Sequence, residues 1–536
     1  MHWKRYRDLP NNEKYNETYY IIGLDIGNDS TGIAFYNLYE NAPEPIDPSG
    51  GYGKPTIPTV MQYITETKEW VFGEYAILNQ GAGTEITLQS LTRRLGQLDY
   101  QEIGGKPVSV VSLMGMFIRE LLASLRNINP KAEIVGIVAA VPAYLSEGAH
   151  EELLRAFKYA GYEKELIALV PDRECVLAHH FQNSPPRDDK VLLLDYGSRE
   201  VRGGVYVADK NMGVKSLSSI FDDTLGTGMI DEDVYGLFES YYNAVQDNSK
   251  GSEASTHDNS QEYGVSPPHR TPQLTAFTYQ HKDILFQKNI RTKPAKLYFN
   301  FVYPPFQQTV THSDTEMLIK PYRQQFSRFI QDTLEKTIAT GIAGGVRPKA
   351  ISPHDISSVV CVGGGFEMLW AREEVSAVFT QSQIRMYKNA KLVTAEGAAL
   401  VAAKMLKVTK GYNFTVEDRH QLPVDIGIST GDVFLPLAAM GTFWWQKRPP
   451  TLMIVNSPVN GEMRLTLVER TVTGESRHLA GYNLTGLPTR PKGTTRLKFG
   501  LSFKSNTDIA LRVEDLGFGE LFPKTGYSGE FVIKLA

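Results

Sequence analysis

The chain has 536 residues, enough for two or more domains with separate cores. Its 42% hydrophobic and 22% charged residues are ordinary for a globular protein, and a net charge of −4 argues against a broad nucleic-acid surface. No apolar run approaches the roughly 20 residues that span a bilayer, and two cysteines, Cys175 and Cys361, suit a reducing cytosol. We therefore expect a cytoplasmic protein with neither nucleic-acid nor membrane partners.

The first part of the chain alternates strand-like and helix-like segments. Residues 1–18 are polar and are expected to form a loose arm. Apolar patterning then predicts two strands between Tyr19 and Phe35, a strand at Val60–Ile64, a helix at Val111–Arg126, a strand at Ile134–Val141 and a helix at Ser146–Ala160.

The second part continues this alternation and then changes character. A strand-rich region reaches Val207, and helices are predicted after Gly228, at Glu316–Thr340 and at Ala395–Lys407. Residues 247–273, rich in Ser, Asn, His and Pro, read as the least ordered interior segment. From about residue 420, short alternating runs with frequent Gly and Pro predict a separate all-β domain.

Four segments share a pattern that is typical of phosphate binding. Each is an apolar run that breaks into a turn with glycines, a proline or a carboxylate: residues 23–27, 141–144, 191–197 and 359–365. Glycine lets backbone N–H groups approach an anion closely. Asp25 and Asp195 each end such a run, where a carboxylate can hold a metal ion or its waters. The order of the four segments along the chain predicts one phosphate-binding site formed by residues that are far apart in the sequence.

These segments resemble those of the heat-shock-protein-70 family, within the actin-like ATPase superfamily, over about residues 19–536. Gly23–Gly27, Leu193–Gly197 and Val362–Gly365 look like its two phosphate loops and its adenosine loop. The resemblance implies an α/β plus all-β chain, with an actin-like ATPase fold of two ribonuclease-H-like lobes followed by a β-sandwich. The implied domains are a nucleotide-binding domain at 19–410, a linker at 411–424 and a peptide-binding-like domain at 425–536.

The resemblance also implies ligands and residue roles. ATP or ADP with Mg²⁺ would bind in a cleft between the lobes, the metal being held through water by Asp25 and Asp195. Asp172 or Glu174 would orient the attacking water, and Pro142 with His150 would couple the nucleotide to the second domain. The implied nucleotide-binding residues are Gly27, Asn28, Asp29, Gly197, Ser198, Gly226, Gly228, Gly363, Gly364 and Gly365.

Several positions depart from the family pattern. Arg202 stands where the family has an aspartate, and the second phosphate loop carries Arg199 and Glu200 in place of glycine. Thr92 replaces the lysine that contacts the transferred phosphate. Phosphoryl transfer depends on positioning and on neutralising charge, so losing these groups affects turnover more than binding. The sequence thus supports nucleotide binding better than hydrolysis, and any ATPase activity is expected to be weak.

The all-β region resembles the substrate-binding domain of the same family. Residues 482–493, with Leu484-Thr485-Gly486-Leu487-Pro488, resemble a loop of its substrate-binding β-sandwich. Peptide or protein clients would bind there in extended form, and the candidate lining residues are Phe434, Leu435, Met440 and Trp444. The linker has few apolar residues for docking, and no lid-like helices follow the last predicted strand, so we expect weak coupling and rapid peptide exchange.

Three functions remain open on this basis. The first is a divergent chaperone-like protein that couples nucleotide to peptide binding. The second is a non-hydrolysing, nucleotide-sensing scaffold with a dedicated protein partner. A small-molecule kinase is the third, although kinases that share the phosphate loops would not carry the β-domain.

Overall fold

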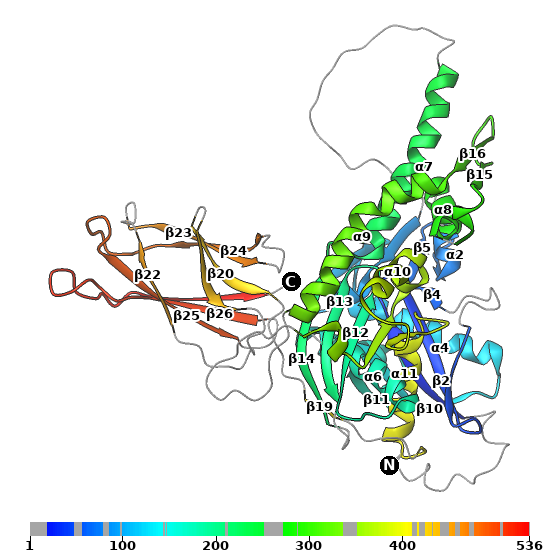
Figure 1. Ribbon diagram of the computed structural model, residues 1–536, viewed down its shortest axis with the longest axis horizontal. Helices are drawn as coiled ribbons and strands as arrows, with labels where there is room; N and C mark the ends of the chain where they lie inside the picture. The colour runs from blue at the N-terminus through cyan, green and yellow to red at the C-terminus, as the bar shows by residue number, and fades with distance from the viewer. Residues whose placement is uncertain are drawn as a thin grey trace.

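The computed structural model describes most of the chain between Tyr19 and Lys534 (Figure 1). The described residues are 19–47, 56–78, 85–96, 99–142, 145, 147–208, 213–250, 272–286, 288–335, 351–409, 415–417, 424–430, 433–439, 450–455, 461–470, 476–503 and 508–534. They form a mixed α/β body and an all-β body, the latter drawn in orange and red in Figure 1.

The first large sheet has the strand order β11-β10-β1-β2-β3, and β4 also pairs with β2. β1 runs parallel to β10 and antiparallel to β2. The inner strands are nearly continuous apolar runs, as expected where both faces of a sheet are covered. The strands are β1 (Tyr19–Ile26), β2 (Ser30–Asn37), β3 (Ala42–Pro45), β4 (Thr56–Pro58), β10 (Glu133–Val141) and β11 (Leu166–Pro171).

The second large sheet repeats this arrangement in the order β18-β17-β12-β13-β14-β19. β12 runs parallel to β17 and antiparallel to β13, as β1 does to β10 and β2. The α/β body therefore contains two sheets of similar strand order. The strands are β12 (Asp189–Tyr196), β13 (Val201–Ala208), β14 (Gly213–Asp222), β17 (Ser358–Val362), β18 (Ile384–Met386) and β19 (Thr415–Glu417).

Helix α11 (Val393–Met405) packs closely against the first sheet and against α6 (Asp172–Asn183). A Cβ at Gly23 of β1 would lie 2.1 Å from the Ala395 carbonyl oxygen, and one at Gly397 would lie 1.8 Å from the Cys175 carbonyl oxygen. Both approaches require glycine. The other helices are α2 (Glu74–Leu78), α3 (Leu91–Arg94), α4 (Val110–Ile128), α5 (Glu147–Ala160), α7 (Thr227–Lys250), α8 (Pro272–His281), α9 (His312–Glu335) and α10 (Leu369–Val378).

Three small sheets complete the α/β body. In Figure 1 the hairpin of β15 and β16 lies near α7 and α8. The strands are β5 (Val60–Ile64), β6 (Glu69–Phe72) and β7 (Glu85–Gln89) in one sheet, β8 (Tyr100–Ile103) and β9 (Lys106–Ser109) in the second, and β15 (Ala295–Phe299) and β16 (Phe306–Val310) in the third.

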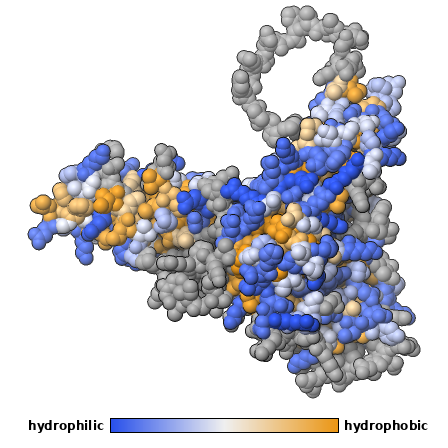
Figure 2. Space-filling model, viewed as in Figure 1, coloured by the Kyte–Doolittle hydropathy of each residue, from blue (hydrophilic) through white to orange (hydrophobic). Residues whose placement is uncertain are grey.

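The all-β body consists of two four-stranded antiparallel sheets that share one apolar core. Ile428, Leu467, Leu497 and Leu511 are fully buried in it. On the face drawn in Figure 2, apolar residues also gather at the surface of this body. The strands are β20 (Asp425–Thr430), β21 (Val433–Ala438), β23 (Met463–Arg470) and β24 (Ser476–Leu484) in one sheet, and β22 (Thr451–Val455), β25 (Thr495–Phe503), β26 (Asp508–Asp515) and β27 (Ser528–Lys534) in the other.

Ordered elements extend into two segments that were predicted to connect others. The segment predicted to be least ordered, at about residues 247–273, is bordered by two helices: α7 continues to Lys250 and α8 begins at Pro272, and the residues between them lie outside the described residues. Extending an existing helix costs little, so α7 propagates through polar residues. The segment predicted as a linker contains β19, which pairs in parallel with β14. Among the described helices, none is long and apolar enough to cross a membrane.

Candidate functional site

The turn after β1 and the turn after β12 have the same backbone hydrogen bond. The Gly27 N–H donates to the Ser30 carbonyl at 3.1 Å, and the Gly197 N–H donates to the Glu200 carbonyl at 3.0 Å. Both turns therefore lie at the carboxyl end of the first strand of their sheet. In open α/β sheets this is the end at which ligands bind.

The start of α7 packs directly on the second turn. The Gly228 N–H donates to the Ser198 carbonyl at 2.5 Å, and a Cβ at Gly226 would lie 2.1 Å from the Arg199 carbonyl carbon. A Cβ at Gly228 would also lie 4.0 Å from Asp29 Oδ2, so the first turn lies opposite this helix start. Gly226 and Gly228 thus bring the two predicted phosphate loops together.

The triple glycine after β17 also reaches this place. Gly363 has φ +91°, and a Cβ there would lie 2.7 Å from Asp195 Oδ1. Beside it, the Lys391 chain lies against Gly364, and its Nζ is 3.1 Å from Glu367 Oε2. The structure therefore brings together the predicted segments that contain Gly27, Gly197, Gly226 and Gly363.

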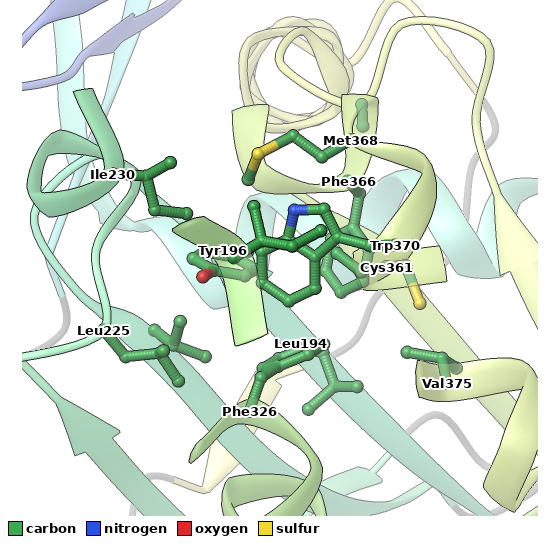
Figure 3. Close-up of a cluster of buried hydrophobic side chains, with 14 of the residues drawn as sticks. Leu194, Tyr196, Leu225, Ile230, Phe326, Cys361, Phe366, Met368, Trp370 and Val375 are labelled. Carbon is green, nitrogen blue, oxygen red and sulfur yellow. The ribbon is translucent and has the colours of Figure 1, made fainter. Parts of the chain in front are cut away.

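An apolar cluster anchors these turns from behind (Figure 3). Tyr196, which follows Asp195, and Phe366, which follows Gly365, point toward one another with ring centroids 6.2 Å apart. Trp370 packs edge-on against Tyr196 at 6.0 Å, and Leu225 belongs to the same buried cluster. The turns are thus fixed by side chains on a rigid core rather than carried on long loops.

Asp25 and Asp195 are the next-to-last residues of β1 and β12. Burial, together with the charges of Asp195 and Asp172, raises the pKa of Asp25 to about 7. Burial also raises the pKa of Asp195 to about 6, although the nearby Arg202 guanidinium acts to lower it. Asp195 is therefore close enough to Asp25 to oppose its ionisation.

Arg202 lies among the carboxylates of this region. It faces Asp195 directly across the β12–β13 ladder, and its Nη1 is 3.9 Å from Asp195 Oδ2. Its Nε donates to Glu200 Oε1 at 2.6 Å, and its Nη1 donates to Asp172 Oδ2. At the corresponding position of the first sheet, Asp25 faces Gly32. The sequence pointed to Arg202 as a departure but gave no sign of its partners.

The two candidates for orienting water differ in placement. Asp172 opens α6 immediately after β11, and its Oδ1 accepts a 2.7 Å hydrogen bond from the Arg173 N–H. Glu174 lies two residues further along the same helix, and residues at that spacing do not share a helix face. Asp172 is bound to Arg202 and electrostatically coupled to Asp25.

The charged groups suit a magnesium ion held through water. Asp25 and Asp195 provide two carboxylates in a desolvated region, and Mg²⁺ prefers oxygen ligands while keeping several of its waters. Within the described part of the chain, no three His, Cys, Asp or Glu side chains are grouped to bind a metal directly. Asp25 and Asp195 are thus the residues of this region that could hold such an ion through its waters.

The first turn is also linked to α5. The Thr92 hydroxyl, on α3, donates to Asn28 Oδ1, and the Gly96 N–H donates to Glu152 Oε2 of α5 at 2.5 Å. The predicted coupling residues flank this route: Pro142 follows β10, and His150 lies half-buried on α5. Their coupling role stays a prediction.

The predicted peptide-binding residues are only partly described. Both Phe434 and Leu435, on β21, are partly buried. Leu435 packs against the sandwich core, and Arg470 Cζ lies 4.0 Å from the ring centroid of Phe434. Met440 and Trp444 lie outside the described residues. The grouping of these four residues therefore stays a prediction.

The stretch at residues 482–493 has a structural role that its sequence did not reveal. Arg490 forms a two-pronged ion pair with Asp515, with distances of 2.7 and 2.8 Å, and both side chains are buried. Burial acts to raise the pKa of Asp515, but the hydrogen bonds from Arg490, Thr525 and Gly517 outweigh it and leave the pKa well below its usual range.

Two further features lie at the surface. Arg477 of β24 is 2.8 Å from Asp223, which precedes α7, so an ion pair joins the all-β body to the α/β body. A surface depression of about 650 Å³ lies along α9 and α10, where Figure 2 shows a hydrophilic surface. Its lining residues are Ser313, Glu316, Met317, Lys320, Arg323, Gln324, Ser327 and Glu374.

Two family models match parts of the chain. A family of unknown function, the DUF5716 C-terminal family, matches residues 42–211, which run from β3 into the segment after β13. A domain of unknown function, DUF8552, matches residues 419–535. The second match covers the strands of the all-β body, and the chain is therefore similar to DUF8552 proteins in that body and to DUF5716 proteins in much of the α/β body.

Proposed function

We propose that this protein is a cytoplasmic, chaperone-like protein that binds ATP or ADP with magnesium where the glycine turns converge. The observation that carries the proposal is the contact of the turns at Gly27, Gly197, Gly226 and Gly363, which are far apart in the sequence. The repeated strand order of the two large sheets also supports an actin-like fold of two lobes.

The residues at this point suit a nucleotide's phosphates. Backbone N–H groups of glycine turns and the start of α7 favour an anion. Asp25 and Asp195 would hold the magnesium ion through its waters, and the ion would neutralise phosphate charge. Lys391 and Glu367, beside Gly364, lie where the bound nucleoside would be recognised.

The all-β body is proposed to bind extended peptide segments of a client or a dedicated partner. Its strands β21 and β22, each at one side of its sheet, expose apolar side chains at Val433, Leu452 and Ile454. Main-chain hydrogen bonds along such a strand bind a peptide, and exposed apolar side chains favour an apolar sequence. The ion pair between Arg477 and Asp223 supports communication between the two bodies.

The test is titration calorimetry with ATP and ADP in the presence of magnesium. Binding of both nucleotides by the wild-type protein, and weaker binding by Asp195→Asn only when magnesium is present, is the expected result. Asp99→Asn serves as the matched control, because Asp99 pairs with Arg94 rather than with a residue of the turns. If neither nucleotide binds, the proposal fails.

A non-hydrolysing nucleotide sensor is the second candidate, and the surroundings of Arg202 favour it. Phosphate release measured on the same samples separates the two: rapid turnover supports a working ATPase, whereas binding without turnover supports the sensor.

A further inference from the structure

Arg202 connects the two large sheets where the glycine turns converge. It belongs to β13 of the second sheet, and it donates through Nη1 to Asp172, which follows β11 of the first sheet. The ion pair therefore runs between the two halves of the α/β body. An ion pair between fully exposed side chains contributes little to stability. The Asp172 and Arg202 side chains, however, are only 16% and 27% exposed.

A second carboxylate fixes the position of this guanidinium. Arg202 Nε donates to Glu200 Oε1 at 2.6 Å, and the Glu200 side chain is buried. A guanidinium has its donors in one rigid plane, so two carboxylates on different edges determine its orientation. Releasing it would leave the buried Glu200 charge without this partner, which is costly. Arg202 is thus a fixed part of the site.

The hydrogen bonds of Asp172 bear on whether it can act as a general base. Its Oδ1 accepts from the Arg173 N–H at 2.7 Å, and its Oδ2 accepts from Arg202. A general base has to reach the attacking water at roughly 2.6–3.2 Å, or through one further water, with an oxygen aimed at the proton it accepts. Here both oxygens of Asp172 already point toward other donors.

We propose that Arg202 suppresses ATP hydrolysis by holding Asp172 away from the attacking water, so that the protein binds and releases ATP without turning it over. This inference rests on the proposed nucleotide site. In hydrolysis, the water oxygen bonds to the γ-phosphorus, and the bond from that phosphorus to the β–γ bridging oxygen breaks. The electron pair of that bond leaves with ADP, and the water proton passes to the Asp172 carboxylate. Arg202 acts on the last of these transfers, as a positioning residue.

If Arg202 instead promoted hydrolysis, its removal would lower the rate of turnover. In some phosphoryl-transfer enzymes an arginine stabilises the transition-state charge, and its removal lowers the rate by orders of magnitude. Arg202 is already paired with Asp172 and Glu200, and these two negative charges weaken its attraction for a phosphate. Removal of Arg202 is therefore expected to raise turnover rather than to lower it.

The test measures ATP affinity by calorimetry and phosphate release at saturating ATP, in magnesium buffer, for a set of variants. We expect Arg202→Gln to raise kcat by about 10- to 100-fold, within the range that a general base contributes, with little change in ATP affinity. Arg202→Lys keeps the charge beside Asp172 and is expected to stay slow. Adding Asp172→Asn to Arg202→Gln is expected to abolish the gain. Arg119→Gln, on the exposed side of α4, is the matched control.

Folding is checked by thermal melting of each variant. Should Arg202→Gln fail to fold, the double variant Arg202→Gln/Glu200→Gln removes the guanidinium together with its buried partner, and it carries the same expectation. The inference is overturned if turnover is unchanged or lower without Arg202, or if the gain survives Asp172→Asn. Absence of ATP binding by the wild-type protein would instead refute the proposed nucleotide site.

Discussion

Asp25 and Asp195 occupy equivalent positions in two sheets of similar strand order, and the charge of Asp195 raises the pKa of Asp25. Across the ladder, however, Asp25 faces Gly32 whereas Asp195 faces Arg202. The two halves of the site are thus alike in backbone and different in charge. In the second half, the aspartate faces a cation, the Arg202 guanidinium.

The pKa of Asp25 predicts how stability depends on pH in metal-free protein. Its folded pKa is about 7 against an ordinary value of 3.8, so between these values the folded protein holds a proton that the unfolded chain has released. The free energy of unfolding therefore falls as pH rises from about 4 to 7. Asp25→Asn is expected to raise the melting temperature at pH 8, with a smaller gain at pH 5.

The control for this prediction is Asp99→Asn, for which the sign is reversed. A hydrogen bond from Arg94 lowers the pKa of Asp99, so its ionised form is favoured in the folded protein. That variant is expected to melt slightly lower at pH 8. A melting temperature of Asp25→Asn at or below the wild-type value at pH 8 would contradict the account of Asp25.

The pair of Arg490 and Asp515 is expected to stabilise the all-β body only as a complete pair. Removing Arg490 leaves a buried carboxylate without its main partner, so Arg490→Ala should lower the free energy of unfolding by about 3–5 kcal/mol. Denaturant unfolding measures this change. Lys498→Ala, which breaks a partly exposed pair with Glu514, should cost no more than about 1 kcal/mol.

The double variant Arg490→Met/Asp515→Leu provides a sharper test of the same pair. Replacing both charges with apolar side chains leaves no buried ion, and it should cost less than Arg490→Ala. A larger loss in the double variant would mean that packing, rather than charge, dominates at this place.

Gly397 is expected to tolerate no side chain. Its ideal Cβ would lie 1.8 Å from the Cys175 carbonyl oxygen, so Gly397→Ala must push α11 away from α6. We expect a loss of about 1–3 kcal/mol or more, measured by denaturant unfolding. Gly236→Ala on α7 is the matched control, because its Cβ would meet no atom within 4 Å. There alanine should stabilise the helix by up to about 1 kcal/mol.

Periodic patterns in the sequence located the elements well. Met114, Phe117, Leu121, Leu122 and Leu125 predict one helix face, and all are buried on α4. Aspartates that end apolar runs beside glycine likewise predicted the turns at Asp25 and Asp195. These signals are local, since each depends on residues within one or two turns of chain.

Pairings between distant residues left no such signal. Asp172 and Arg202 are brought together by two different sheets, and Asp515, at the end of β26, pairs with Arg490 in the segment between β24 and β25. Neither pair produces a periodic pattern in the sequence. Phe434 and Leu435 were predicted to line one pocket, although consecutive residues of a strand point to opposite faces. In the structure both residues are partly buried: Leu435 packs against the core, and Phe434 lies beside Arg470.

The pairing of β19 with β14 covers part of an edge of the second large sheet. β14 is otherwise the last strand on its side of the second sheet, and an uncovered sheet edge offers free N–H and C=O groups to any extended chain. β19 covers part of that edge with the segment that leads to the all-β body. A protein proposed to handle extended peptides thus shields its own sheet from them, and detachment of residues 415–417 would expose a site for aggregation.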